Sequence, residues 1–243
     1  MRIGLIADTH LPQAIVREPW PQVAEAFRGV DLVLHAGDIS YSGCLDWLEG
    51  IAPVLAALGN HDMGLEGDPR VKPLHVLEVE GWRLGLIHDM EPETRPISYL
   101  MERYFPQPVD IMLSGHTHYE RVDLRDNVLQ ANPGSAIMPH NFSPRLGTVG
   151  ILDVQRGRVT VDIVSLGEGP QVSGNLLRNP ARPMRFEAHR GPKGLEGAVP
   201  QGLSGFQIRQ KQGSLRGLTP RPGSAHKKTR RPPEGWRPSG SRF

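Results

Sequence analysis

Five apolar segments of this chain each end in a short cluster of Asp, His or Asn residues. The segments are short, rich in aliphatic residues and bounded by turn-forming residues, which is typical of buried β-strands. The clusters are Asp8/His10, Asp38, Asn60/His61/Asp62, His88 and His116/His118. One polar residue after a strand is an ordinary turn residue, but turn chemistry does not explain five such clusters. We expect them to meet at the carboxyl ends of the strands, where α/β sheets bind ligands.

The order of strands and helices along the chain predicts an α/β fold. Strands are expected at 2–7, 31–35, 54–58, 73–80, 82–87, 109–113, 119–124, 128–131, 148–154 and 158–164, and helices at 21–28, 42–48 and 97–104. The strand–helix alternation in the first part indicates parallel strands with helical crossovers. Turn signals such as Glu80-Gly81 predict hairpins in the later part. We expect one domain with two mixed sheets.

Charge and composition change sharply near residue 168. Residues 1–170 carry 13 Lys and Arg against 23 Asp and Glu, whereas residues 171–243 carry 15 against 3. The second part holds 20 Pro and Gly among 73 residues and has no sustained hydrophobic period. Such a segment cannot bury enough apolar surface to offset the entropy of ordering. We expect a folded domain at residues 1–168 and a disordered basic Pro/Gly/Arg-rich tail at 169–243.

The basic tail has three interpretations. The first is an arm that contacts nucleic acid or another polyanion. The second is a solvated extension without a partner, and the third is a segment whose composition was never shaped by folding. The tail lacks the regularly interleaved aromatic residues that stack on bases. The last two interpretations are therefore favoured, and the domain is expected to work without the tail.

The sequence also predicts the cellular setting. The single cysteine, Cys44, excludes an intrachain disulfide and is expected to pack on a helix face. No run approaches the roughly 18 apolar residues of a membrane span, and the apolar run before Asp8 lacks a signal-peptide pattern. We expect a cytoplasmic protein with no membrane contact, and a homo-oligomer is left open.

The side chains of the five clusters form a recognisable set of metal ligands. Carboxylate, neutral imidazole and amide oxygen suit Mn²⁺, Fe, Zn²⁺ or Ni²⁺ better than Ca²⁺, which prefers oxygen alone. Seven or so ligands are too many for one tetrahedral site, whereas two ions that share a carboxylate would use them all. Two divalent ions are therefore expected, with Mn²⁺ favoured and Mg²⁺ as a further alternative to the transition metals.

These motifs resemble the signature of the calcineurin-like metallophosphoesterases. The resemblance rests on Asp8-x-His10, Gly37-Asp38, Gly59-Asn60-His61-Asp62, His88 and Gly115-His116-x-His118, in that order. The short N-terminal spacings and the later Asn132-Pro133-Gly134-Ser135 are similar to the small prokaryotic YfcE-like phosphodiesterase branch. The resemblance covers about residues 1–167 and implies a four-layer α/β/β/α sandwich with two mixed sheets.

The resemblance also implies a role for each residue. Asp8, His10, Asp38 and His118 would bind the first metal, and Asp38 would bridge to a second metal completed by Asn60, His88 and His116. A bridging hydroxide would attack phosphorus in line. His61 would stabilise the transition state or protonate the leaving oxygen. Asp62 would orient His61, with a helix or turn cap as the equal alternative.

The expected function is metal-dependent hydrolysis of a small phosphate ester, with a phosphodiester favoured. A phosphomonoesterase or a nucleotide pyrophosphatase on the same site is the first alternative, and a nuclease that uses the basic tail is another. A non-catalytic protein-binding scaffold, as in the related retromer subunit, is the alternative outside enzymes. Because scaffold relatives tend to lose ligands or the histidine at position 61, the complete set here favours hydrolysis.

Other polar residues have less specific interpretations. His35 is expected to be packed or to support a ligand, and His75 to be structural or exposed. His140 is a candidate for substrate contact in a Pro-flanked loop. Residues 132–135 are expected to form a turn that supports the sheets near the site.

Overall fold

The computed structural model describes residues 1–10, 21–137, 147–167, 184–191 and 194–198. The helices are α1 (Pro21–Ala26), α2 (Ser42–Glu49) and α3 (Ile97–Tyr104). The strands are β1 (Arg2–Ile6), β2 (Leu32–His35), β3 (Val54–Ala57), β4 (Val71–Lys72), β5 (Leu74–Val79), β6 (Trp82–Ile87), β7 (Ile111–Leu113), β8 (Glu120–Arg125), β9 (Val128–Pro133), β10 (Thr148–Gln155), β11 (Arg158–Ser165), β12 (Met184–Gly191) and β13 (Gly194–Ala198).

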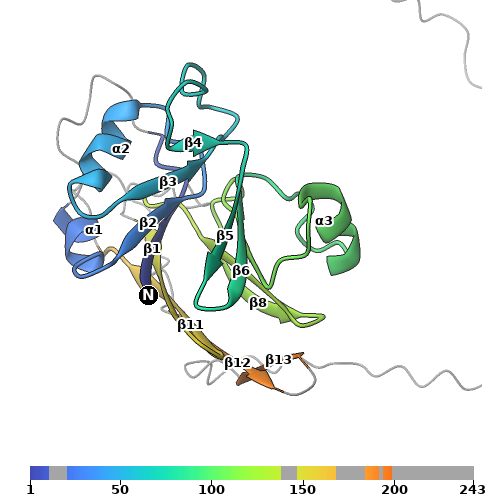
Figure 1. The fold of residues 1–243 in the computed structure, drawn as a ribbon. Helices are drawn as coiled ribbons and strands as arrows, with labels where there is room; N and C mark the ends of the chain where they lie inside the picture. Colours follow the sequence, from blue (N-terminus) through green and yellow to red (C-terminus); the bar gives the residue numbers. More distant parts are fainter. Residues whose placement is uncertain (11–20, 138–146, 168–183, 192–193, 199–243) are drawn as a thin grey trace, which may run out of the picture. The chain divides into compact units, whose positions relative to one another are not determined.

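Two mixed sheets form the centre of the fold (Figure 1). The eight-stranded sheet has the order β13-β12-β11-β10-β1-β2-β3-β4, and the five-stranded sheet has the order β5-β6-β7-β9-β8. In the first sheet β1 to β4 are parallel, and β10 joins β1 in the antiparallel direction. In the second sheet β6, β7 and β9 are parallel to one another. The prediction of two mixed sheets is confirmed.

Three layers of apolar side chains separate four layers of secondary structure. The largest group lies between the sheets and includes Leu5, Trp82 and Leu113. A second group packs α1 and α2 on the outer face of the eight-stranded sheet, with Phe27 and Leu45 fully buried. A third group packs α3 on the five-stranded sheet through Leu100. These groups give the expected α/β/β/α sandwich, and Figure 1 shows the helices on the two outer sides.

The short α2 helix illustrates why these segments become helical. Cys44, Leu45 and Leu48 recur at helical spacing and are buried, while the intervening residues reach solvent. Cys44 therefore packs on the helix face as predicted, and burial raises the pKa of its thiol to about 12. The thiol stays protonated and unreactive near neutral pH. None of the helices in the described part of the chain is both long enough and apolar enough to span a membrane.

The sheet continues beyond the boundary that composition predicted. Strand β12 pairs with β11 in antiparallel register, and β13 pairs with β12. The expected end of the folded part at residue 168 is therefore too early. In β12 the alternation of Met184, Phe186 and Ala188 with charged residues puts Phe186 and Ala188 into the layer between the sheets. The sequence analysis missed this alternation because the segment as a whole is basic and rich in Pro and Gly. Residues 199–243 lie outside the described residues.

Two smaller differences concern strand ends. The two-residue strand β4 was not predicted, because it is too short to show a period. Asn132 and Pro133 were assigned to a turn, but they are the last residues of β9. This extension carries Asn132 to the edge of the sheet at which the polar clusters of the sequence gather.

Replacement of Phe186 by Ala tests whether β12 belongs to the domain. The side chain is 7% exposed, so its loss should lower the free energy of unfolding by about 3 kcal/mol. Chemical denaturation of the full chain measures this change. Arg185→Ala on the same strand is the control and should change stability by less than about 0.5 kcal/mol. An unaltered midpoint for Phe186→Ala would place β12 outside the cooperative unit. Any truncation that probes the tail must keep residues 184–198.

Candidate metal centre

The five polar clusters converge at the carboxyl ends of parallel strands from both sheets. Asp8 and His10 follow β1, Asp38 follows β2, Asn60 follows β3, His88 follows β6, and His116 and His118 follow β7. Parallel strands bring their carboxyl ends to one edge of a sheet. The backbone N–H of His116 donates to both carboxylate oxygens of Asp8 at 3.0 Å, which joins the edges of the two sheets.

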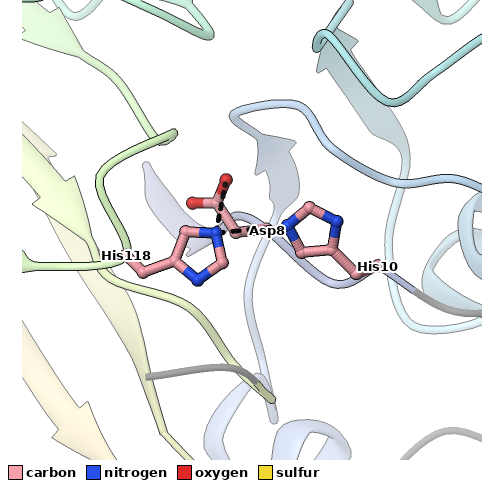
Figure 2. A group of neighbouring side chains, drawn as sticks. All are labelled: Asp8, His10 and His118. Carbon is pink, nitrogen blue, oxygen red and sulfur yellow. Dashed lines mark hydrogen bonds and ion pairs between the residues drawn. The ribbon is translucent and has the colours of Figure 1, made fainter. Parts of the chain in front are cut away.

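Six of the seven predicted ligands form two groups of three. The first cluster is Asp8, His10 and His118, and the second cluster is Asp38, His88 and His116. Within each cluster one donor atom per residue lies within 4.8 Å of the others. Figure 2 shows the first cluster, in which His118 reaches both Asp8 and His10 from the loop after β7. The Nε2 atoms of His10 and His118 are 3.2 Å apart.

Asp38, a member of the second cluster, also faces the first cluster. Its Oδ2 is 3.5 Å from Nε2 of His10 in the first cluster, and its Oδ1 is 3.4 Å from Nε2 of His88 in the second. One carboxylate thus presents one oxygen to each cluster. The seventh predicted ligand, Asn60, joins the second cluster, because its Oδ1 is 2.9 Å from His88 Nε2 and 3.1 Å from His116 Nδ1.

The second cluster has the chemistry of a cation site. Nδ1 of His88 is 2.7 Å from the carbonyl oxygen of Ala36, so Nδ1 carries the ring proton and Nε2 presents a lone pair. That lone pair faces the Asn60 amide oxygen and an Asp38 carboxylate oxygen, and both of these atoms are acceptors. Converging acceptors repel one another unless a cation lies between them. The residues present therefore fit a divalent metal.

Burial shifts the pKa values of several ligands. Desolvation, reinforced by the nearby Asp38 carboxylate, raises the pKa of Asp8 from 3.8 to about 8. Burial lowers the pKa values of His10 and His88 below 6.5. The two imidazoles are therefore neutral and ready to bind a metal near neutral pH, whereas Asp8 must first lose a proton.

The backbone at five of the predicted ligands has an unusual conformation. Asp8, His10, Asp38, His116 and His118 all have positive φ, between 42° and 70°. Residues other than glycine rarely adopt this left-handed conformation, and each such residue costs of order 1–3 kcal/mol. The surrounding hydrogen bonds must therefore hold these residues in place, and the strain is concentrated where the ligand atoms converge.

Two glycines allow the loops to approach one another. Gly37 has a φ of +88°, and a Cβ there would lie 2.5 Å from Nδ1 of His88. A Cβ on Gly59 would lie 2.2 Å from the backbone nitrogen of Asp38. Larger residues would push His88 or Asn60 away from Asp38, so these glycines set the spacing of the second cluster.

His61 lies beside the first cluster rather than in either cluster. Its backbone N–H donates to Oδ1 of Asp38 at 2.8 Å, and its ring meets the ring of His10 edge-on with centroids 5.2 Å apart. The residue is exposed. A molecule that reaches the first cluster from solvent would therefore meet the imidazole of His61.

Of the two roles predicted for Asp62, the structure agrees with the cap and not with the orientation of His61. Its buried carboxylate accepts hydrogen bonds from the backbone N–H groups of Ile39 at 2.6 Å, Ser40 at 2.7 Å and Gly59 at 2.7 Å. Among the described residues, no hydrogen bond joins Asp62 to His61. A buried carboxylate requires donors, and here the donors belong to the loops that carry Asp38 and Asn60. Asp62 thus acts as a cap between the two loops.

The remaining predicted histidines have structural surroundings. Nδ1 of His35 accepts the N–H of Gly37 at 3.1 Å, and Nε2 meets the Thr9 hydroxyl at 3.1 Å. Burial lowers the pKa of His35 to about 3, so the ring stays neutral and supports the loops of Asp8 and Asp38. His75 is buried and bonded to the carbonyl of Ala56. His140 lies outside the described residues.

Sequence reasoning missed Glu93 altogether. Its carboxylate accepts a hydrogen bond from the Ser114 hydroxyl at 2.8 Å, just before the loop of His116 and His118. Glu93 lies in a Pro-containing loop with no motif or periodic pattern, so the sequence did not indicate this contact. Ser135, assigned to a turn, also supports a ligand, because its hydroxyl donates to the carbonyl of Asp8 at 2.7 Å.

Comparison with known proteins agrees with this geometry. The model of the calcineurin-like phosphoesterase superfamily domain matches residues 1–157. A probable metallophosphoesterase of Methanothermobacter thermautotrophicus is 35% identical over 172 residues, which are 69% of this chain and 94% of the relative. A phosphodiesterase of Methanocaldococcus jannaschii is 23% identical over 169 residues, which are 64% of this chain and 95% of that protein.

The fold is also found among solved structures. Vacuolar protein sorting 29 from Cryptosporidium parvum aligns with a TM-score of 0.57 at 19% identity, over 82% of this chain and 96% of the other. At this identity the likeness concerns the fold alone. The family match covers the part of the chain that carries all seven predicted ligands, and the resemblance seen in the motifs is confirmed. The chain belongs to the calcineurin-like phosphoesterase superfamily.

Proposed function

We propose that this chain is a metal-dependent phosphodiesterase that uses two divalent ions, with Mn²⁺ as the favoured metal. The observation that carries the proposal is the position of Asp38, whose two oxygens face two separate groups of ligands. A single metal would need one cluster only. A carboxylate placed between two clusters is suited to a pair of ions that share a ligand.

The assignment of ligands follows the two clusters. Asp8, His10 and His118 hold the first ion, Asn60, His88 and His116 hold the second, and Asp38 binds both. The two cations would neutralise charge on the phosphoryl oxygens and lower the pKa of a water molecule enough for it to attack phosphorus. Asp62, Gly37 and Gly59 keep the ligands at the spacing described above, so little reorganisation is needed.

His61 is the residue placed to act on the leaving group. It is exposed, lies at the ring edge of His10 and is tethered to Asp38 only through its backbone. Its imidazole is therefore free to turn toward a substrate and can donate a proton to the oxygen that departs from phosphorus. A diester leaving group needs such a proton, because an alkoxide leaves poorly from phosphorus.

A comparison of two chromogenic esters tests the substrate class. Metal-stripped full-length protein is reconstituted with Mn²⁺, and hydrolysis of bis-p-nitrophenyl phosphate is compared with that of p-nitrophenyl phosphate while metal per chain is counted. We expect two ions per chain and a higher kcat/KM for the diester. A higher kcat/KM for the monoester would replace the phosphodiesterase by a phosphomonoesterase. Bound metal without hydrolysis of either ester would favour the protein-binding scaffold.

Substitutions at two neighbouring residues should differ in their effect on metal content. Asn60→Ala removes a ligand of the second ion, so turnover should fall below detection with a loss of bound metal. His61→Ala should keep both ions and lower kcat by about 10²–10⁴-fold for a diester with an alkoxide leaving group, as expected for a general acid. Elemental analysis of the purified variants and steady-state kinetics separate the two cases. Loss of metal from His61→Ala would make His61 a ligand instead of an acid.

Metal binding should release a proton from Asp8. Because the pKa of Asp8 is about 8 in the metal-free fold, its carboxyl is mostly protonated near neutral pH. The metal binds the ionised form, so affinity should rise with pH until the pH passes about 8. Calorimetric titration in buffers with different ionisation enthalpies counts the released protons. Affinity that is independent of pH between about 6 and 8 would contradict this origin.

A further inference from the structure

We propose that Asn132 is a positioning residue that holds the loop of His116 and His118 so that one loop serves both clusters. The inference rests on the metal assignment proposed above. Asn132 is the last residue but one of β9, which lies beside β7 in the parallel direction, and Asn132 is 1% exposed. It therefore reaches the same edge of the five-stranded sheet as the loop that leaves β7.

The amide of Asn132 contacts this loop directly. Its Nδ2 donates to the carbonyl of Gly115 at 2.8 Å and lies 3.2 Å from the hydroxyl of Thr117. Its Oδ1 accepts the backbone N–H of Gly134 at 2.9 Å, which fixes the orientation of the amide with the NH₂ group toward the loop. One side chain thus links the end of β9 to the two small residues that flank His116.

The loop needs such a support because its conformation is strained. His116 and His118 have φ values of 70° and 58°. Gly115 is wedged between the sheets, since a Cβ there would lie 2.7 Å from the carbonyl oxygen of Ala36. Gly115 N–H donates to the carbonyl of His88 at 3.0 Å. The Gly115 carbonyl also accepts the backbone N–H of Thr117 at 2.8 Å, but that bond lies within the loop. Without the Asn132 amide the carbonyl would lose the bond that ties it to β9, and the loop could relax away from Asp8.

Asn132 also touches a third segment of the site. Its Nδ2 is 3.3 Å from Oε1 of Glu93, the oxygen that accepts the hydroxyl of Ser114. Glu93 is 12% exposed and pairs with Arg121 at 3.4 Å. Glu93 belongs to the segment that follows His88. The buried amide therefore connects the segment of His88 to the loop that gives His116 to the second cluster and His118 to the first.

This arrangement couples the two metal positions through one loop. A shift of the loop moves His118 away from Asp8 and His10, and it moves His116 away from Asp38 and His88. Loss of the Asn132 amide should therefore weaken both ions together. A residue that only stabilised the fold would lower the melting temperature of the metal-free protein and leave metal affinity unchanged.

Direct titration of the full-length, metal-free protein with Mn²⁺ tests the proposal without any substrate. Asn132→Ala should weaken binding of both ions by about tenfold to a hundredfold, the usual cost of losing a residue that orients ligands. Gln130→Ala is the matched control. Gln130 is a buried amide two positions earlier on the same strand, but it bonds to Arg125 and not to the loop. The control should keep affinity within about twofold of the wild type.

Thr117→Val provides a second variant in case Asn132→Ala does not fold. It removes the hydroxyl that meets the Asn132 amide and leaves the amide itself in place, so a smaller weakening of both ions is expected. Wild-type affinity in a folded Asn132→Ala or in Thr117→Val would overturn the inference, as would an equal loss in Gln130→Ala. A wild-type chain that binds no Mn²⁺ would overturn the proposed function as well, which distinguishes the two failures.

Discussion

The shared carboxylate of Asp38 is the interaction on which the site depends. It stands between two groups of imidazoles in a left-handed conformation, with φ of 55°. Gly37 permits the close approach of His88, Gly59 permits that of the Asn60 loop, and the Asp62 carboxylate fastens both sides through backbone N–H groups. Most of the unusual local features near β2 and β3 serve to hold this one side chain where two clusters can use it.

The same arrangement is costly for the protein without metal. Asp8 is fully buried, and its pKa is raised far above its ordinary value, because burial and the negative charge of Asp38 both disfavour ionisation. Left-handed residues and converging acceptors add to this cost. Two divalent cations would remove the repulsion between the carboxylates and turn the converging lone pairs into bonds. The metal-free fold is therefore less stable than it would be without these converging side chains, but the side chains are already in position for a metal.

The sequence predicts which polar side chains converge better than it predicts the residues that support them. Asp8, His10, Asp38, Asn60, His88, His116 and His118 follow apolar runs, and strand order alone places them at one edge. For Asp62 the sequence left orientation of His61 and a cap as equal alternatives, because two of its three partners, Ile39 and Ser40, lie more than twenty residues away in the chain. Glu93 and Asn132 act through long-range contacts that leave no periodic signal. Strand β12 was missed because its apolar residues alternate with charged ones, within a segment whose basic, Pro- and Gly-rich composition suggested disorder.

The hydrogen bond between His116 and Asp8 spans 108 residues of sequence and joins the two sheets. Neither sheet contains a complete cluster, since each cluster takes ligands from loops of both. The loops of the first sheet alone would therefore lack His118, the third residue of the first cluster. A metal would therefore find complete clusters only after the non-local docking of the two sheets, the kind of step that slows folding. An ion that bound only the assembled sandwich would stabilise the docked arrangement of the two sheets, and chelation would remove that stabilisation.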